Sequence, residues 1–335
     1  MVSGNQDMFS MLIISGSSHM ELAQNIAKNL FQDLVPCELG LFSNGETRVK
    51  INKTIRGNDV VIVQTGYSKD ISVNDIVMET ALLIDACNRS SAKSVTLIMP
   101  CYPYARQDRK DSSRVPISAK VIANLLGNSG TTRIVCMDLH ASQIQGFTDC
   151  PTDNLYTVKL VHDKLHELYR IRDESERGKY MLISPDAGAA KRTEKFHNVM
   201  KLEMCLMHKQ RDYSKPGTVK KNILVCEKDT DFSGKIAIIT DDMIDSGGTF
   251  IKACETLIEW GFSKVIGVIT HGYFTGTALE KINASDAIEK IIVTNSICQT
   301  TNIQNCSKLE QIDVSSQLAE AIKIIHEGGS MADLF

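Results

Sequence analysis

Short apolar runs alternate with segments of helical periodicity along most of this 335-residue chain. In the first half, runs of β-branched and other apolar residues predict buried strands at residues 11–15, 60–63, 95–99 and 134–137. Apolar positions at helical spacing predict helices over residues 18–30, 76–87 and 117–126. Ser18 and Glu21 have the spacing of a capping box, so the first helix is expected to start at Ser18. Strands that alternate with helices predict a mostly parallel sheet with helices on both faces.

The same alternation resumes after residue 156. Helices are predicted at residues 158–168 and 314–326, and strands at 181–184, 223–226, 236–240, 265–270 and 291–294. Because the two halves match in size and order, we predict two similar α/β domains, at residues 8–155 and 156–335. The charge-rich stretch 170–179 is predicted to be a solvated surface excursion.

Composition narrows the class of protein. With 43% hydrophobic residues the chain can bury two cores, and a net charge of −3 without a long basic run gives no sign of a nucleic-acid partner. No apolar run reaches the ~18 residues of a membrane span. The N-terminus lacks a secretory signal, so a cytoplasmic location is expected. Ten cysteines occur without a Cys-x-x-Cys pair, which predicts buried thiols and neither disulfides nor zinc.

Residues 235–249 form the most specific stretch of the chain. Asp241 and Asp242 stand where the strand predicted at 236–240 is expected to end, and the turn Asp-Ser-Gly-Gly-Thr at 245–249 precedes a helical segment. A strand, a glycine-rich turn and a helix direct backbone N–H groups and a helix dipole at one point, which suits a phosphate. The two acids repel a phosphate, so they must hold an attached group with hydroxyls or a cation. A phosphorylated sugar has both features; the alternative is an ordinary turn that binds nothing.

Two loops of the first half carry further candidates. Residues 42–46, Phe-Ser-Asn-Gly-Glu, lie between extended segments, and their Asn-Gly pair favours a plain hairpin turn. The loop after the strand at 95–99 carries the basic residues Arg106, Arg109, Lys110 and Arg114. They suit a polyphosphate, and open α/β sheets bind ligands in such loops at the carboxyl ends of strands. A merely solvated charged loop is the alternative.

Acids and one histidine provide candidate Mg²⁺ ligands. His140 follows a predicted strand and has Asp138, Asp149 and Asp153 near it in the sequence. A histidine in such a place more commonly makes ordinary hydrogen bonds. Asp186 follows the first strand of the second half, and its alternative role is to cap a helix.

Lys209 and Arg211 stand two positions apart on an extended segment that precedes a polar stretch. Alternate residues of a strand point to the same side, so both cations can reach one anion from a mobile arm. A bare surface loop is equally consistent with this pattern.

Taken together, these segments resemble the ribose-phosphate pyrophosphokinase family. The most specific shared stretches are Tyr104-Ala-Arg-Gln-Asp, Ser113-Arg-Val-Pro-Ile-Ser-Ala-Lys120, Ser184-Pro-Asp-Ala-Gly, and residues 137–147 and 241–249. The resemblance covers nearly the whole chain and implies two phosphoribosyltransferase-like domains, each a mostly parallel sheet flanked by helices. A phosphoribosyltransferase, which is one alternative, would share only the last of these stretches.

The resemblance implies a ribose-phosphate diphosphokinase with Mg²⁺ as cofactor. Such an enzyme transfers the β,γ-diphosphoryl group of MgATP to the C1 hydroxyl of ribose 5-phosphate, giving AMP and phosphoribosyl pyrophosphate for nucleotide biosynthesis. Lys209 and Arg211 are then catalytic, and His140 and Asp186 bind the metal. The implied ATP-binding residues are Phe42, Asn44, Glu46, Arg106, Gln107 and Asp111. The implied ribose 5-phosphate residues are Asp241, Asp242, Asp245, Ser246, Gly247, Gly248 and Thr249.

The resemblance also implies a homo-oligomer, a hexamer in this family, in which the turn at 42–46 reaches the adenine held by a neighbouring subunit. Arg56, Arg114 and Ser142 match positions of the regulatory site in the phosphate-dependent class. A second alternative is a non-catalytic regulatory subunit that resembles the enzyme. Such partners depart from the pattern in the arm and the substrate sites, whereas this chain keeps Lys209 and Arg211.

Overall fold

The structure, a computed structural model, describes residues 11–211, 219–226 and 230–334. The chain divides into two compact units between Tyr156 and Thr157. The first unit also contains Ser296–Cys298 and the C-terminal segment from Val314, and the second comprises Thr157–Asn295 and Gln299–Asp313. The predicted second domain, by contrast, ran from residue 156 to the last residue.

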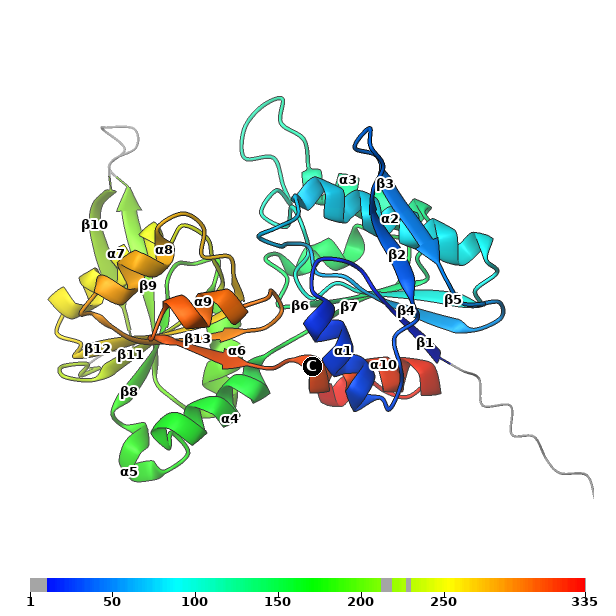
Figure 1. Ribbon diagram of the computed structural model, residues 1–335. Helices are drawn as coiled ribbons and strands as arrows, with labels where there is room; N and C mark the ends of the chain where they lie inside the picture. The colour runs from blue at the N-terminus through cyan, green and yellow to red at the C-terminus, as the bar shows by residue number, and fades with distance from the viewer. Residues whose placement is uncertain (1–10, 212–218, 227–229, 335) are drawn as a thin grey trace, which may run out of the picture. The chain divides into compact units, whose positions relative to one another are not determined.

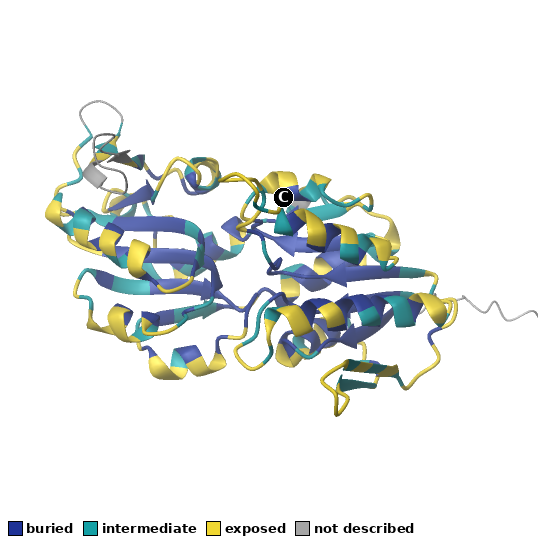
Figure 2. Ribbon diagram, turned by 90° about the horizontal axis from the view of Figure 1, so that it is seen from above, coloured by how far each residue is buried: buried dark blue, intermediate teal, exposed yellow. Residues whose placement is uncertain are grey.

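The first unit is built on a five-stranded parallel sheet (Figure 1). The order of its strands is β1 (Met11–Ser15), β4 (Asp59–Val63), β5 (Ser94–Ile98), β6 (Arg133–Met137) and β7 (Thr152–Leu155). The first four are the predicted strands, and Figure 2 shows them buried between exposed helical surfaces. α2 (Val73–Arg89) and α3 (Ser118–Asn128) pack on one face. α1 (Met20–Asn29) and α10 (Ser315–Glu327) lie against each other on the opposite face.

The first helix does not begin as the capping-box spacing predicts. α1 begins at Met20, and its N-cap is His19, whose Nδ1 accepts a hydrogen bond from the Leu22 N–H at 3.4 Å. The Ser18 hydroxyl instead donates to Gln64 Oε1 at 2.5 Å and accepts from the Thr65 N–H at 3.0 Å. The prediction was wrong because a buried network with residues far along the chain engages Ser18, and a local pattern cannot reveal such partners.

The predicted C-terminal helix exists but belongs to the first unit. Asn29 donates to the Ser315 hydroxyl at 3.1 Å, and Gln317 donates to the Tyr156 carbonyl at 3.0 Å. Near its other end, His326 Nδ1 lies 3.4 Å from Asp59 Oδ2. The apolar periodicity of a helix shows that it covers a core, but does not show which core it covers.

The second unit has a seven-stranded sheet. Its order is β10 (Val219–Val225), β9 (Met204–Arg211), β8 (Tyr180–Ser184), β11 (Ile236–Ile244), β12 (Lys264–Gly272), β13 (Ile288–Thr294) and β14 (Leu309–Ile312). Only β10 is antiparallel. The helices are α4 (Val158–Tyr169), α5 (Glu174–Arg177), α6 (Ala190–Met200), α7 (Gly248–Glu259), α8 (Ala278–Ala284) and α9 (Thr300–Asn305). None of the helices in the described residues is both long and apolar enough to cross a membrane.

Strand β11 is longer than predicted. It continues through Asp241 and Asp242 to Ile244 and stays paired with β12 over that length, whereas its pairing with β8 stops at Ile239. The expected end at residue 240 was inferred from the loss of apolar residues. Backbone pairing with β12 keeps the chain extended, and the acids are tolerated because the neighbouring strand on the other side has already ended.

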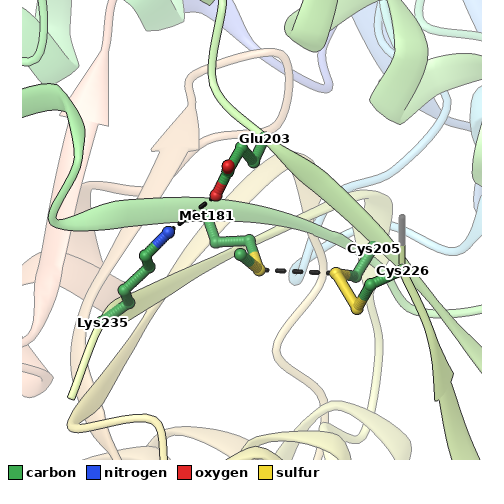
Figure 3. Close-up of a disulfide and its surroundings, with 5 residues drawn as sticks. All are labelled: Met181, Glu203, Cys205, Cys226 and Lys235. Carbon is green, nitrogen blue, oxygen red and sulfur yellow. Dashed lines mark hydrogen bonds and ion pairs between the residues drawn. A yellow bond between two sulfur atoms is a disulfide. The ribbon is translucent and has the colours of Figure 1, made fainter. Parts of the chain in front are cut away.

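One pair of cysteines contradicts the expected absence of disulfides. Cys205 in β9 and Cys226, which follows β10, are joined by a disulfide with a Cα–Cα separation of 4.5 Å (Figure 3). The expectation rested on spacing in the sequence, whereas the antiparallel pairing of β9 with β10 brings the two positions together. Closing a loop of this length stabilises a folded chain by about 3 kcal/mol. The expectation of buried thiols is confirmed for Cys87, Cys101, Cys136, Cys254 and Cys306.

Candidate active site

Two adjacent carboxylates and one guanidinium lie near the C-terminal end of β11. Arg192, in the first turn of α6, places Nη1 3.2 Å from Asp242 Oδ1 and 3.7 Å from Asp241 Oδ1. The Asp242 side chain is 5% exposed and that of Asp241 is 31% exposed. Asp242 therefore anchors the arginine, while Asp241 is the acid that solvent and a ligand can reach.

This cluster carries two potential negative charges for one positive charge. Burial and repulsion by Asp242 raise the pKa of Asp241 above its ordinary range, and Arg192 opposes that shift. The Asp242 N–H also donates to Asp241 Oδ1 at 2.9 Å. A surplus of carboxylates favours hydroxyl donors or a cation over an anion, as inferred for the non-phosphate part of a sugar phosphate.

The glycine-rich turn leads directly into α7. Gly247, the N-cap of this helix, is buried and has a φ of +76°, a conformation that strains other residues. No side chain among the described residues caps α7, and Ser246, Gly248 and Thr249 are exposed beside its first turn. Uncapped N–H groups at the positive end of a helix dipole make this turn suitable for a phosphate.

Asp245 helps to shape this turn. The Thr275 hydroxyl donates to Asp245 Oδ1 at 2.6 Å, and the Thr275 N–H donates to the Asp245 carbonyl at 3.1 Å. These bonds tie the turn after β11 to the segment after β12. Since a carboxylate repels a phosphate, they support a positioning role for Asp245 over direct contact with the anion.

Of the two metal candidates, Asp186 lies in the second unit, in the turn between β8 and α6. Its Oδ1 accepts the Ala189 N–H at 3.0 Å, and the side chain is exposed. This bond resembles the capping role considered above, although Ala189 itself is the N-cap of α6. Oδ2 accepts no hydrogen bond from the described residues, so the carboxylate keeps an oxygen for a ligand.

His140 lies in the first unit, where it is exposed just after β6. The three acids considered with His140 differ in their surroundings: Arg133 Nη1 lies 2.5 Å from Asp153 Oδ2, Asp138 is 2% exposed, and Asp149 is exposed. Among the described residues no group of three or more His, Cys, Asp or Glu side chains forms a metal cage. Asp153 is thus engaged by Arg133, and the described residues do not gather three of these side chains around His140.

The loop between β5 and α3 holds the other ATP candidates. The Ser118 hydroxyl donates to Gln107 Oε1, and the Ala119 N–H donates to the Gln107 carbonyl at 3.2 Å. Gln107 thereby anchors the loop to the start of α3. Arg106 and Asp111 are exposed beside it.

Residues 42–46 form the tip of a hairpin between β2 (Cys37–Leu41) and β3 (Thr47–Ile51), as predicted. The turn is closed by the Phe42 N–H donating to the Glu46 carbonyl at 2.7 Å. Phe42 is 52% exposed at this tip, and Asn44 and Glu46 are exposed with it. An aromatic ring held out on a rigid turn is available to a partner.

Lys209 and Arg211 both lie in β9, where Lys209 pairs with Asn222 and Arg211 with Val219 of β10. The structure describes the backbone of Lys209 and Arg211 but not their side chains, so the contacts assigned to these side chains stay predictions. The backbone gives them alternate positions on one strand, in agreement with the extended segment predicted.

The three regulatory candidates are not gathered at one place within the first unit. Arg56 precedes β4 and donates to the Ser91 hydroxyl at 3.2 Å, at the N-terminal edge of the parallel sheet. Ser142 follows β6 at the opposite, C-terminal edge, and Arg114 lies in the loop after β5. Their shared role stays a prediction.

Two family models match the chain. One describes the N-terminal domain of ribose phosphate pyrophosphokinase and matches residues 11–130; the other, a phosphoribosyl synthetase-associated domain, matches residues 214–335. Among solved structures, the chain is similar to phosphoribosylpyrophosphate synthetase from Mycobacterium smegmatis, with 34% identity and a TM-score of 0.85. The match covers 96% of this chain and 100% of that one. The chain belongs to the ribose-phosphate pyrophosphokinase family.

Membership in this family confirms the predicted two-domain α/β fold and the predicted activity of a ribose-phosphate diphosphokinase, with ATP and ribose 5-phosphate as substrates. Nothing favours the regulatory-subunit alternative. The adenine phosphoribosyltransferase from Saccharomyces cerevisiae is 16% identical, over 38% of this chain and 72% of its own. The one from Leishmania donovani is 18% identical, over 45% of this chain and 68% of its own. Their TM-scores of 0.29 carry no inference about function.

Two residues that support the site were not among those predicted from the sequence. Arg192 pairs with both acids of β11, and Thr275 fixes Asp245. The signal for Arg192 was its place just after Asp186, because the loops that follow adjacent parallel strands meet at one edge of the sheet. Thr275 had no local signal, since only the pairing of β11 with β12 brings it to the turn.

Proposed function

We propose that the diphosphokinase reaction of this chain takes place where β11 ends and α7 begins. The observation that carries this proposal is the pair Asp241 and Asp242 beside an uncapped helix terminus. The 5-phosphate of ribose 5-phosphate binds the turn 245–249, and the ribose hydroxyls donate to the carboxylate of Asp241. One short segment thereby binds both ends of a sugar phosphate.

Asp241 and the turn hold the C1 hydroxyl in place for attack on the β-phosphorus of ATP. The bond between the attacking oxygen and that phosphorus forms as the bond to the α-phosphate oxygen breaks; AMP leaves, and the proton of the C1 hydroxyl is released to solvent. Phosphoryl transfer of this kind depends on positioning and on cations rather than on a covalent intermediate. Lys209 and Arg211 are proposed to supply the cations, from the strand β9.

Mg²⁺ is the proposed cofactor, in keeping with the general dependence of the family. Mg²⁺ keeps several waters and is commonly held by one or two carboxylates together with substrate phosphates. The exposed carboxylate of Asp186, which keeps Oδ2 for a ligand, fits that donor chemistry. His140 fits less well, because hard cations prefer oxygen ligands. When bound, the ion neutralises charge on the phosphate oxygens.

We expect the purified protein to convert ATP to AMP, and not to ADP, only when ribose 5-phosphate and Mg²⁺ are both present. Chromatography of the nucleotide products measures this directly. Ribose without its phosphate is the matched control, and it should react poorly because the turn before α7 has no anion to bind. ADP as the product would contradict diphosphoryl transfer.

We further propose that the chain works as a homo-oligomer, a hexamer, in which the exposed tip at Phe42 completes the adenine site of a neighbouring subunit. Phe42→Ala should then raise the KM for ATP while leaving the KM for ribose 5-phosphate nearly unchanged. Activity measured across a dilution series, with light scattering for mass, tests the assembly. A fully active monomer would rule this arrangement out.

A further inference from the structure

The strand that carries Lys209 and Arg211 leaves its sheet part-way along. Pairing of β9 with β8 ends at Leu206, opposite Ser184, while pairing with β10 runs from Leu206 to Arg211. Beyond Leu206, β9 and β10 are therefore a two-stranded ribbon, at the end of the sheet where Figure 1 shows them side by side. An isolated two-stranded ribbon is at best marginally stable in water.

The disulfide lies at the root of this ribbon. Leu206 pairs with Val225, so the next antiparallel positions are Cys205 and Cys226, which the disulfide joins. Their Cα separation of 4.5 Å is that of the closer class of antiparallel pairs. The bridge spans 21 positions of sequence and so encloses the whole ribbon, Lys209 and Arg211 included.

The two ends of the ribbon are anchored unequally. On the β9 side, Cys205 is buried with Sγ 3.4 Å from Met181 Sδ, and Lys235 Nζ lies 2.7 Å from Glu203 Oε2 just before the strand (Figure 3). On the β10 side, the strand lies at the edge of the sheet and pairs only with β9. Leu224 and Cys226 are only partly buried where they pack against the core of this unit, and further along the chain the ring of Phe232 stacks on Phe262 at 5.2 Å.

The two sulfur atoms also differ in access. Cys205 is 1% exposed, whereas Cys226 is only partly buried. The thiols of the two cores are poor competitors in exchange, because burial raises the pKa of Cys37 to about 11 and that of Cys87 to about 12, and raises those of Cys136 and Cys254 further. Disulfides that exist in reducing compartments are usually transient or regulatory.

We propose that Cys205–Cys226 is a redox-sensitive staple at the root of the catalytic ribbon, opened by dithiol reductants and closed by disulfide oxidants. The proposal rests on the role assigned above to Lys209 and Arg211. A reductant thiolate attacks Cys226 Sγ, the S–S bond breaks, and Cys205 leaves as a thiolate that takes up a proton. The second thiol of the reductant then displaces Cys226, so two electrons and two protons reach the protein and the reductant becomes a disulfide.

Opening the staple removes the covalent tie of the β10 side, which is then held by its pairing with β9 and by the packing of Leu224 and Cys226, while the β9 side keeps its pairing with β8 as well. The positions of Lys209 and Arg211 then depend on the ribbon's own pairing. Since a 1 Å misplacement of a catalytic group can cost about 100-fold in rate, partial loosening should lower kcat on the order of tenfold. The KM for ribose 5-phosphate should change little, because Asp241 and the turn 245–249 lie outside the ribbon.

The full-length protein is assayed for AMP formation after treatment with dithiothreitol and again after re-oxidation with oxidised glutathione. Alkylation and mass measurement report the state of the bridge at each step. We expect kcat to fall with the fraction of open bridge and to recover on re-oxidation. Cys226→Ser should show the low kcat in both conditions. Cys150→Ser, which removes a similarly half-buried thiol of the other unit, is the matched control and should keep the full response.

A kcat that does not follow the state of the bridge, or that rises when the bridge opens, would overturn this proposal. So would a loss confined to the KM for ribose 5-phosphate, or a redox response that persists in Cys226→Ser. If that variant fails to fold, the reversible titration of the unmodified protein decides alone. The absence of AMP in every redox state would instead count against the proposed reaction, so the two failures are distinguishable.

Discussion

Replacing Lys209 by alanine should lower kcat by at least roughly 100-fold and leave the KM for ribose 5-phosphate nearly unchanged. If the ammonium group of Lys209 contacts the phosphoryl oxygens only as their negative charge redistributes in the transition state, it stabilises that state and adds little to the binding of the substrates. Removal of such a group affects turnover alone. Steady-state kinetics with both substrates varied measures the two constants separately, and circular dichroism verifies the fold.

Lys323→Ala is the matched control, because Lys323 is an exposed lysine of α10 in the other unit. It should behave as the unmodified protein does. Near-normal kcat in Lys209→Ala, or a change in the KM for ribose 5-phosphate alone, would show that the role assigned to this strand is wrong.

Regular patterns in the sequence were enough to predict most of the sheet. The strands β1, β4, β5 and β6 are buried on both faces, so they appear as continuous apolar runs that are easy to locate. Features that depend on distant partners were not predictable in the same way. The apolar stripe of α10 gave no sign that it covers the first unit, and Ser18 gave no sign of its bonds to Gln64 and Thr65.

The candidate site shows the same division. The turn 245–249 is local in the sequence, and its glycines and its place between strand and helix predicted the shape that the structure has. Arg192 and the Cys205–Cys226 bridge arise from packing and strand register, and no spacing in the sequence announces them. The bridge in particular follows from antiparallel pairing at the edge of the sheet, whereas the spacing of the cysteines in the sequence had argued against any disulfide.

Asp241→Asn should raise the KM for ribose 5-phosphate by about 10- to 100-fold, because hydrogen bonds to a charged acceptor contribute about 1.5–3 kcal/mol. The ionised carboxylate accepts hydrogen bonds from the ribose hydroxyls more strongly than the neutral acid does. Burial and Asp242 raise its pKa, so kcat/KM for ribose 5-phosphate should increase with pH above the ordinary range of an aspartate. Asparagine does not ionise, so kcat/KM of the variant should not show this increase with pH.

The raised pKa of Asp241 predicts that the stability of the folded chain decreases with pH, whereas kcat/KM increases. Between the ordinary pKa and the raised pKa of Asp241, the folded chain holds a proton that the unfolded chain has released, so stability falls as pH rises through this window. Asp241→Asn should therefore melt at a higher temperature than the unmodified protein at the upper end of the window, while binding substrate more weakly. Asp33→Asn, at an exposed carboxylate, should change neither property. If Asp241→Asn instead lowered both substrate affinity and the melting temperature at high pH, Asp241 would be a structural anchor rather than the acid that binds the sugar.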